Sequence, residues 1–485
     1  MSDSERQQYL ASIAALTASV ETLTATNAEQ AATIRRLESK VDALTRLVEG
    51  RKRERAPRVK PAPKAKPADP RSAAAKRDDN RAALQLASHD AGEHPHEVSP
   101  DAQVCAHCGD DADFRPVGEG RTSELYDYVP GYFRRSRHVV HSVACTCGKT
   151  IVSAKGPDRA TPKSKYGPGL AALCITHKCV LGMPIHRIEK LLRGHGTPVS
   201  RSTLNDLFVR VAKKLEPIVD VLFAQVRAAD LVLADETKLK LVSHNKQAWM
   251  WVFIGDGAVV FVFSRSRAAA VATEAIGGTT GTLLTDGYSG YNPLTGDGGR
   301  EAARCHSHLR RELYEALPRA PEAQQAIDIY QDIFRIEADA HAKGIAGSDQ
   351  HLSIRQRHIG PLFGKLKKWL AQAKQDLSPA SDLHKAIEYV QNQWRPAMRC
   401  LYDPNVPLTN NESERTIRCV AIGRKAFYGV QSHDGGRALA TLYSLVATCE
   451  AEGVDAFAYL TDAIVRIETE PADQLTPRRW AQAQS

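Results

Sequence analysis

The sequence of 485 residues contains no apolar run long enough to span a membrane and no segment that resembles a signal peptide. We therefore expect no membrane partner and a cytoplasmic protein. Residues 51–103 also lack apolar periodicity and are rich first in Lys, Arg, Pro and Ala and then in polar residues. Such a composition cannot bury enough apolar surface to fold, so this segment is predicted to be a disordered linker.

Acidic residues are fewer than basic ones, with 56 Asp and Glu against 65 Lys and Arg and a formal net charge of +9. Most of the excess lies in residues 51–71, at the start of the predicted linker. A basic run of this kind binds the phosphate backbone without reading base sequence, which makes nucleic acid an expected partner. The alternative is a run that only keeps the chain soluble.

Apolar side chains recur at alternating spacings of three and four residues in the first 50 residues, which predicts a coiled coil. One seam position holds Ile13, Val20, Asn27, Ile34, Val41 and Val48, and the other holds Leu16, Leu23, Gln30, Leu37 and Leu44. β-Branched residues at the first position and Leu at the second favour a parallel homodimer, whose register Asn27 would fix. The alternative is a single amphipathic helix that folds back on its own chain.

Four cysteines occur as two close pairs, each followed by a glycine: Cys105 with Cys108, and Cys145 with Cys147. Four thiolates suit a closed tetrahedral site, so one structural Zn²⁺ is predicted here. The second pair is tighter than the usual two-residue spacing, and His107, His138 or His141 could replace a ligand. The alternative is a set of reduced structural thiols.

The remaining six cysteines are scattered and are predicted to be ordinary buried thiols. They are Cys174, Cys179, Cys305, Cys400, Cys419 and Cys449.

Two helical segments, 184–192 and 201–215, follow the predicted zinc module, and Ser200 or Ser202 could cap the second. This pair could be a helix-turn-helix-like element whose second helix enters a major groove. Its expected DNA contacts are Arg201, Asn205 and Arg210. The connection is longer than the tight turn of that motif, so an ordinary helical hairpin is the alternative.

The middle of the chain carries short apolar runs typical of buried strands. Residues 231–235 form the first run, which ends in Asp235, and the next two are separated by the hairpin signal Asp256-Gly257. An Ala-rich helical stretch and a fourth apolar run then lead to Asp286. Because a crossover helix tends to place the later strand parallel and adjacent, Asp235 and Asp286 should lie side by side at the carboxyl ends of their strands.

A third carboxylate is available in the segment 409–415. Thr409 and Glu412 have the spacing of a helix capping box, which gives Glu412 a structural role. Glu414 is then the better candidate, with Arg418 four residues on and on the same helix face, where it could contact phosphate. Three converging carboxylates are a suitable ligand set for two divalent cations.

The choice between Asp235 and Glu236 rests on strand geometry, because adjacent strand residues point to opposite faces and only one can enter the site. We predict Asp235. Each of these motifs alone usually has a structural role: Asp-Gly forms turns, Asn-Asn lies in loops, and an Asp at a strand end acts as a cap. A structural role does not readily explain why all of them occur in this order.

Basic residues near these acids could contact phosphate, or they could form a solvated surface. They are Arg310, Arg311, Arg415, Arg418, Arg424 and Lys425.

Several of these segments, in this order, resemble motifs of the insertion-sequence-sixty-six family of bacterial DDE transposases. They are ADET at 234–237, TDGYSGYN at 285–292, CHSHLRREL at 305–313, NNESERTIR at 410–418 and IGRK at 422–425. The resemblance extends from about Cys105 to about Ile467. It implies Asp235, Asp286 and Glu414 as catalytic acids that bind two Mg²⁺ (or Mn²⁺) ions in a ribonuclease H-like fold.

The resemblance further implies an all-α insertion between the second and third acids, and DNA as the partner, both as the terminal inverted repeats of the element and as target. One metal would activate first water and then a 3′-hydroxyl, and the other would stabilise the leaving oxygen. A dimer or higher oligomer would hold two element ends together, and small accessory proteins of the same element are further expected partners. The alternatives are a metal-dependent nuclease or resolvase without strand transfer, and an inactive DNA-binding relative.

The expected fold class is α/β, with a mixed-sheet catalytic core. The expected organisation is a coiled-coil helix at 1–50, a basic linker at 51–103, a zinc-finger-like DNA-binding module at 104–160, a helical DNA-binding region at 161–228, a catalytic domain at 229–470 with a helical insertion at about 312–400, and a tail at 471–485.

Overall fold

The computed structural model describes residues 156–197, 199–244, 246–427 and 429–484, together with His138 and two short antiparallel strands, β1 (Ser142–Ala144) and β2 (Ile151–Ser153). The predicted coiled coil, the linker and the four paired cysteines lie outside the described residues, so these predictions stay predictions. Among the helices that are described, none has the length and apolarity needed to cross a membrane.

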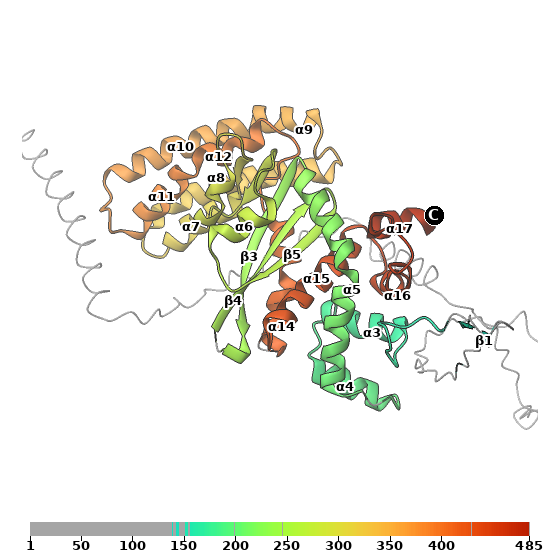
Figure 1. Cartoon of the computed structure of the whole chain (residues 1–485). Helices are drawn as coiled ribbons and strands as arrows, with labels where there is room; N and C mark the ends of the chain where they lie inside the picture. Colours follow the sequence, from blue (N-terminus) through green and yellow to red (C-terminus); the bar gives the residue numbers. More distant parts are fainter. Residues whose placement is uncertain are drawn as a thin grey trace, which may run out of the picture. The chain divides into compact units, whose positions relative to one another are not determined.

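A five-stranded mixed sheet with the strand order β5-β4-β3-β6-β7 lies at the centre of the fold (Figure 1). Its strands are β3 (Leu231–Leu241), β4 (Lys246–Gly255), β5 (Ala258–Ser264), β6 (Thr282–Thr285) and β7 (Glu301–Arg304). The first three pair antiparallel, whereas β6 pairs parallel with β3 and β7 pairs parallel with β6. The predicted α/β class and the predicted hairpin, formed by β4 and β5, are confirmed.

The turn between β4 and β5 forms where the Asp-Gly pair predicts it. Asp256 has φ 48° and Gly257 has φ 74°, both in the left-handed region that a two-residue hairpin turn requires. Gly257 also lies close to the side chain of Glu452, so a Cβ at this position would clash with it. Local turn chemistry therefore determines this part of the sheet.

The first strand is longer than predicted. β3 does not end at Asp235 but continues to Leu241, and Asp235 itself is paired with Val252 of β4. Beyond Asp235 the strand alternates exposed Lys238 and Lys240 with buried leucines, so one face packs while the other is solvated. Pairing with β4 extends the strand beyond the apolar run.

Helix α15 (His433–Ala451) protects the edge strand β5. The backbone N–H of Phe261 donates to Ser444 Oγ (2.8 Å), and the N–H of Val259 donates to Thr448 Oγ1 (3.1 Å). These hydroxyls satisfy backbone groups that an edge strand would otherwise leave unpaired. Helix α15 also packs on the long helix α5 (Arg201–Ala228), which contacts β4 and β5.

Helix α5 begins where the sequence predicts but runs well past residue 215, with 28 residues in total. Ser200 is its N-cap and accepts a hydrogen bond from the N–H of Thr203 (3.2 Å), which confirms the predicted cap. Its buried stripe continues to Val226. The other helices of this part are α3 (Pro168–Cys179), α4 (Ile185–Gly194), α16 (Ala456–Arg466) and α17 (Pro477–Gln484).

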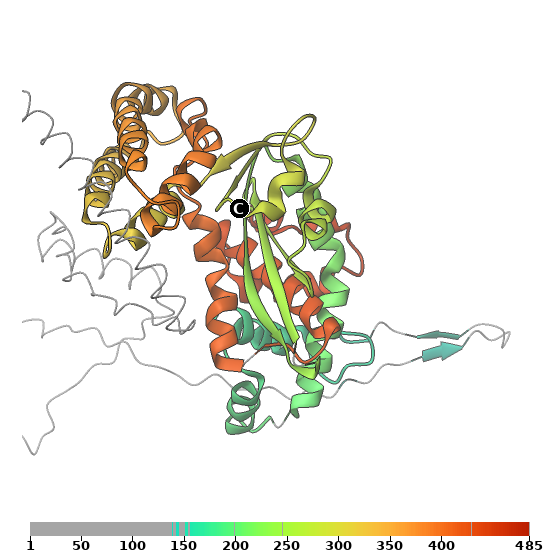
Figure 2. The ribbon, with the colours of Figure 1, turned by 90° about the vertical axis from the view of Figure 1, so that its left-hand side faces the viewer.

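Between β7 and residue 402 the described chain is helical, and Figure 2 shows these yellow to orange helices gathered as a group beside the sheet. Their contact with the sheet includes packing of α12 against the edge strand β7. The elements are α7 (His306–Ala316), α8 (Gln324–Ala342), α9 (Asp349–Ile354), the π-helix η5 (Arg355–Ile359), α10 (Gly360–Gln375), α11 (Asp382–Asn392) and α12 (Trp394–Ala397).

Four further elements that bear on the site lie before or after this helical group in the sequence. They are α6 (Ala269–Ile276) and the 3₁₀ turn η3 (Ser289–Leu294) before it, and α13 (Asn411–Thr416) and α14 (Arg418–Phe427) after it.

Candidate active site

Asp235 and Asp286 come from adjacent parallel strands. Leu233 of β3 is paired with Leu284 of β6, and continuing this register by two residues sets Asp235 beside Asp286. Strand β6 ends at Thr285, so Asp286 is the first residue beyond it, whereas β3 continues past that point. The structure therefore brings these two predicted site residues together through the crossover connection.

Glu414 joins them from α13, and the charges of the three acids affect one another. The pKa of Asp235 is raised to about 7, first by burial and then by the negative charges of Glu236, Asp286 and Glu414. The N–H of Glu236 donates to Asp235 Oδ1 (2.8 Å) and opposes the shift only in part. A cation among these carboxylates would relieve their repulsion.

Glu236, the neighbour of Asp235, already has partners in the protein. Its side chain is buried and accepts hydrogen bonds from Arg267 Nε (2.9 Å) and from the hydroxyl of Tyr291 (2.6 Å). The Arg267 guanidinium in turn lies 3.8 Å from the centre of the Tyr288 ring. Because Glu236 is bound in this way, Asp235 is the carboxylate of the pair that is left for a ligand.

The start of α13 differs from the predicted capping box. The helix begins at Asn411 with Asn410 as the N-cap residue, and no side chain caps it. Thr409 lies one residue too early to cap this helix, and Glu412 is exposed. The prediction is wrong because tertiary contacts of Asn410, which the spacing of Thr409 and Glu412 does not reveal, determine where the helix starts.

Asn410 instead connects α13 to the sheet through a hydrogen bond to β3. It is fully buried, and its side-chain amide donates to the carbonyl oxygen of Ala234 (2.9 Å), the residue before Asp235. This bond fixes the helix that carries Glu414 against the strand that carries Asp235. Sequence reasoning missed Asn410, and its only signal was an Asn directly before a helical segment.

Arg418 is not in the predicted relation to Glu414. Helix α13 ends at Thr416 and α14 starts at Arg418, with Ile417 between them. A spacing of four residues places side chains on one face only within a continuous helix. The break at Ile417, whose side chain is buried, therefore removes the basis of that prediction.

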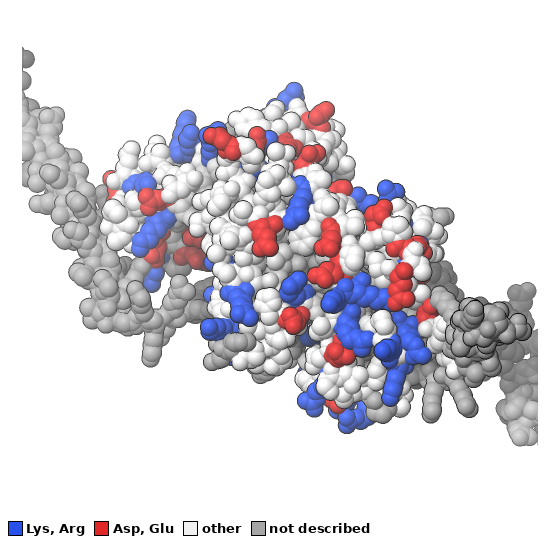
Figure 3. All heavy atoms as spheres, viewed as in Figure 1, with Lys and Arg blue, Asp and Glu red and all other residues white. Residues whose placement is uncertain are grey.

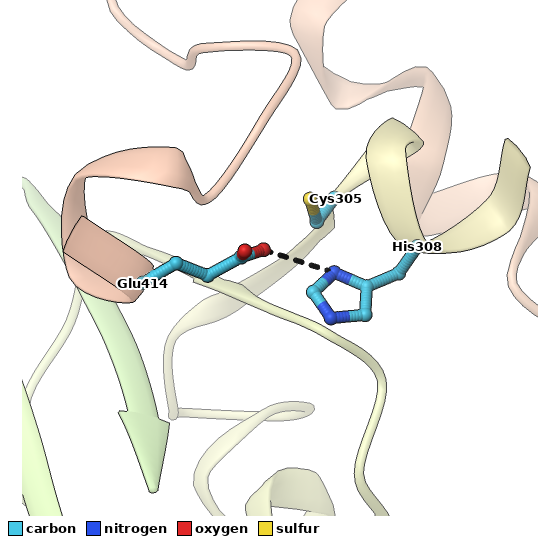
Figure 4. A group of neighbouring side chains, drawn as sticks. All are labelled: Cys305, His308 and Glu414. Carbon is cyan, nitrogen blue, oxygen red and sulfur yellow. Dashed lines mark ion pairs between the residues drawn. The ribbon is translucent and has the colours of Figure 1, made fainter. Parts of the chain in front are cut away.

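Two further side chains, Cys305 and His308, lie beside Glu414 (Figure 4). His308 Nδ1 is 3.6 Å from Glu414 Oε1, and both atoms are buried without a hydrogen-bond partner. Cys305 Sγ accepts a hydrogen bond from the N–H of Asn410 (3.1 Å). Cys305 is buried as predicted, but its place at the site was missed; the Cys-x-x-His spacing of Cys305 and His308 was the available signal.

The comparison with known proteins identifies the family. Residues 163–438 match the model of the transposase IS66 family, and residues 102–148 match that of the zinc-finger binding domain of transposase IS66. The first match alone covers more than half of the chain. The chain belongs to the IS66 transposase family. This confirms the resemblance found in the sequence motifs.

Relatives of this IS66-family chain occur in Sinorhizobium fredii and are named only as uncharacterized proteins. Protein y4jD is 30% identical over an alignment of 392 residues that covers 76% of this chain and 76% of the relative. Protein y4hP is 27% identical over an alignment of 412 residues that covers 78% of this chain and 74% of the relative. Family membership thus supports a transposase role and DNA binding, and the second match supports zinc binding by residues 102–148.

The residues predicted to bind DNA differ in whether their side chains bind other groups of the described protein. Arg201 is paired with Glu189 of α4 (2.7 Å), and Arg424 donates to Thr237 Oγ1 (3.0 Å) and to the Lys238 carbonyl oxygen (2.7 Å). These two side chains already have partners within the protein. Arg310 lies near the ring of Tyr314, with 5.7 Å from the guanidinium carbon to the ring centre.

Arg210 is exposed and donates to the carbonyl oxygen of Pro162 (2.6 Å). The other predicted residues that lie exposed at the surface are Asn205, Arg311, Arg415, Arg418 and Lys425.

The residues present fit a divalent cation of the kind that the family implies. Asp235, Asp286 and Glu414 supply carboxylate oxygens, which are the ligands that Mg²⁺ and Mn²⁺ prefer. Glu414 Oε1 is buried and has no hydrogen-bond donor, so it is available to a cation. Burial and mutual repulsion raise the pKa of Asp235, and a cation bound by these carboxylates would favour their charged forms.

We expect Asp235→Asn to stabilise the protein at pH 8 without added divalent cations. The pKa of Asp235 in the folded chain, about 7, lies above its ordinary value. The unfolded chain therefore ionises this group first, and stability falls as pH rises from about 4 to 7. The full shift corresponds to about 4 kcal/mol, and we expect a gain of about 1–4 kcal/mol.

Thermal unfolding at pH 5 and pH 8 measures this, because the advantage of Asp235→Asn should be larger at pH 8. Glu412→Gln, which removes an exposed carboxylate of α13, is the control and should leave the melting temperature nearly unchanged. A melting temperature of Asp235→Asn at or below that of the wild type at pH 8 would contradict the assigned repulsion.

Proposed function

We propose that this chain is the DNA transposase of an insertion sequence, which cleaves the ends of its element and joins them to target DNA, with Asp235, Asp286 and Glu414 as catalytic acids. The observation that carries the proposal is the meeting of these three carboxylates from β3, the end of β6 and α13 in a chain of the IS66 family. The strand order, with three antiparallel strands followed by two parallel ones, supports a ribonuclease H-like core.

The protein positions each acid through a different contact. Asp235 is held within the pairing of β3 with β4, and Asn410 fastens α13 beside it. Asp286 Oδ1 accepts the N–H of Tyr288 (2.9 Å), and its carbonyl oxygen accepts the hydroxyl of Tyr389 from α11 (2.7 Å). The helical insertion therefore helps to hold the second acid.

Two Mg²⁺ or Mn²⁺ ions held by these carboxylates would activate the attacking hydroxyl and stabilise the leaving oxygen of the phosphodiester. The protein acids themselves form no covalent bond to DNA in this scheme. Their role is to hold the cations in a buried, negatively charged site, since carboxylates alone would repel the DNA backbone.

The basic surface supports DNA binding at two places. Exposed Arg311 belongs to α7, which carries His308, and Arg415 belongs to α13, which carries Glu414. Exposed Arg418 and Lys425 belong to α14, which packs against β3. Figure 3 shows a second gathering of Lys and Arg over α3, α4 and α5. We assign both to the phosphate backbone, through contacts that weaken with salt.

Exposed basic residues of this part of the chain include Lys163 and Lys165, which precede α3, and Arg210 and Lys213 of α5.

The parts outside the described residues complete the proposal. Cys105, Cys108, Cys145 and Cys147 would hold one Zn²⁺ in a module that binds the terminal inverted repeats. The coiled coil at 1–50 would join two copies, so that two element ends are held together. Small accessory proteins of the same element and action in the cytoplasm belong to the same proposal.

The test is excision and strand transfer of a marked element in cells, with the neighbouring open reading frames supplied. We expect transposition with the wild-type chain and none with Asp286→Asn at equal protein levels. A wild-type chain that cuts element ends but never joins them would contradict strand transfer and leave a nuclease. Element ends that are bound but never cut would contradict the enzyme.

A further inference from the structure

Cys305, His308 and Glu414 present three chemically different metal-ligating atoms at one point (Figure 4). A sulfur, a ring nitrogen and a carboxylate oxygen all lie within 4.8 Å of one another. In a tetrahedral zinc site with bonds of about 2.0–2.3 Å, ligand atoms are about 3.3–3.8 Å apart. The 3.6 Å between His308 Nδ1 and Glu414 Oε1 falls within that range.

Two of the three ligand atoms of this cluster lack the partners that buried groups normally have. His308 Nδ1 and Glu414 Oε1 are each buried without a hydrogen-bond partner. Such groups are costly unless something satisfies them, and a cation would satisfy both at once. The charges also suit a divalent ion, because a thiolate and a carboxylate together neutralise it.

The sulfur of Cys305 differs from the other cysteines whose hydrogen bonds are described. Cys400 and Cys419 use their thiols as donors, to the carbonyl oxygens of Ala397 and Thr416. Cys305 Sγ instead accepts the N–H of Asn410 and lies at the start of α7. Burial raises the pKa of the Cys305 thiol, and the backbone N–H groups that point at its sulfur oppose this rise; a bound metal would supply the further stabilisation that the thiolate needs.

We propose that Cys305, His308 and Glu414 form a binding site for a thiophilic divalent cation, Zn²⁺, which competes with the catalytic cations for Glu414. Binding releases the thiol proton of Cys305 to solvent and leaves a fourth coordination position open to water. Sulfur and nitrogen ligands select Zn²⁺ over Mg²⁺, so this site is chemically distinct from the all-carboxylate site. The binding of Zn²⁺ does not depend on the proposed function, whereas its competition with the catalytic cations rests on the proposed role of Glu414.

Co²⁺ is the probe, because its bond to a thiolate gives an absorption band and it binds more weakly than Zn²⁺. The full chain is first loaded with one equivalent of Zn²⁺ to fill the N-terminal zinc module and is then titrated with Co²⁺. We expect one further equivalent to bind with a thiolate band, which added Zn²⁺ abolishes. The band should be lost in Cys305→Ser and kept in the matched control Cys419→Ser.

His308→Gln should weaken Co²⁺ binding by at least about tenfold, and it decides the question if Cys305→Ser does not fold. No thiolate band in the wild type, or the same band in Cys305→Ser, would overturn the site.

The competition is tested in Mg²⁺-dependent cleavage. Zn²⁺ should inhibit cleavage at the concentration that displaces Co²⁺, and cleavage unaffected by saturating Zn²⁺ would overturn the competition. A chain that never cleaves DNA would contradict the proposed function and leave the Co²⁺ result valid.

Discussion

Asp235→Asn, Asp286→Asn and Glu414→Gln are each expected to lower strand cleavage at element ends by at least about 10³-fold. Each change removes one charged oxygen ligand from the cation site, and a loss of about 4 kcal/mol in transition-state stabilisation gives a change of this size. The exposed basic residues are untouched, so binding of the same DNA should stay within about threefold of the wild type, since phosphate contacts dominate affinity.

Single-turnover cleavage of a labelled element end, beside a gel-shift measurement of binding, gives both quantities. Glu412→Gln is the matched control, because Glu412 lies on the same helix as Glu414 but is exposed and makes no contact with the other acids that the structure describes. Its cleavage rate should remain near that of the wild type. A rate above a tenth of wild type in any of the three variants would contradict the assignment of that acid.

Arg355→Met is expected to lower the free energy of unfolding by about 3–5 kcal/mol, the usual cost of removing one partner of a buried ion pair. Arg355 is 1% exposed and pairs with Glu337, which His351 also contacts. It further donates to the carbonyl oxygens of Cys400 (3.2 Å) and Val406 (2.9 Å). The variant would leave a buried carboxylate and several carbonyl groups without a donor.

Denaturant unfolding followed by circular dichroism measures this change. Arg335→Met is the control, because Arg335 lies on the exposed face of α8 and pairs only with Asp332 among the described residues. It should change stability by less than about 0.5 kcal/mol. A loss below about 1 kcal/mol in Arg355→Met would mean that the buried contacts stabilise the helical insertion far less than their burial indicates.

The Arg355 contacts also bear on the site. Cys400 and Val406 shortly precede α13, the helix that carries Glu414. Through its bonds to their carbonyl oxygens, Arg355 connects the helical insertion to this part of the chain. Arg355→Met should therefore reduce cleavage as well as stability, and cleavage assays well below the melting temperature separate the two effects.

Several features were predictable from the sequence because their causes are local. The Asp256-Gly257 turn follows from residues that tolerate positive φ, and the start of α5 follows from the hydroxyl of Ser200. The adjacency of Asp235 and Asp286 follows from the tendency of a strand after a crossover helix to lie parallel to the earlier strand and beside it. These rules act over a few residues or one connection, so the sequence shows them directly.

Other features depend on contacts between distant segments. The extension of β3 to Leu241 requires β4 as its partner, and the start of α13 requires the bond from Asn410 to Ala234, 176 residues away. The meeting of Cys305 and His308 with Glu414 likewise joins the end of β7 to α13. Local sequence patterns do not reveal contacts between segments that lie so far apart in the chain.

The sequence by itself determined the family, the order of the strands and which acids were candidates for the site, because motifs, turn residues and apolar runs are properties of short segments. Only the tertiary structure decided that Glu236 is bound by Arg267 and Tyr291, that Asn410 fastens α13 and that Cys305 and His308 lie beside Glu414. The physical reason is that the role of a polar side chain depends on its burial and its partners, and both are set by packing of segments far apart in the chain.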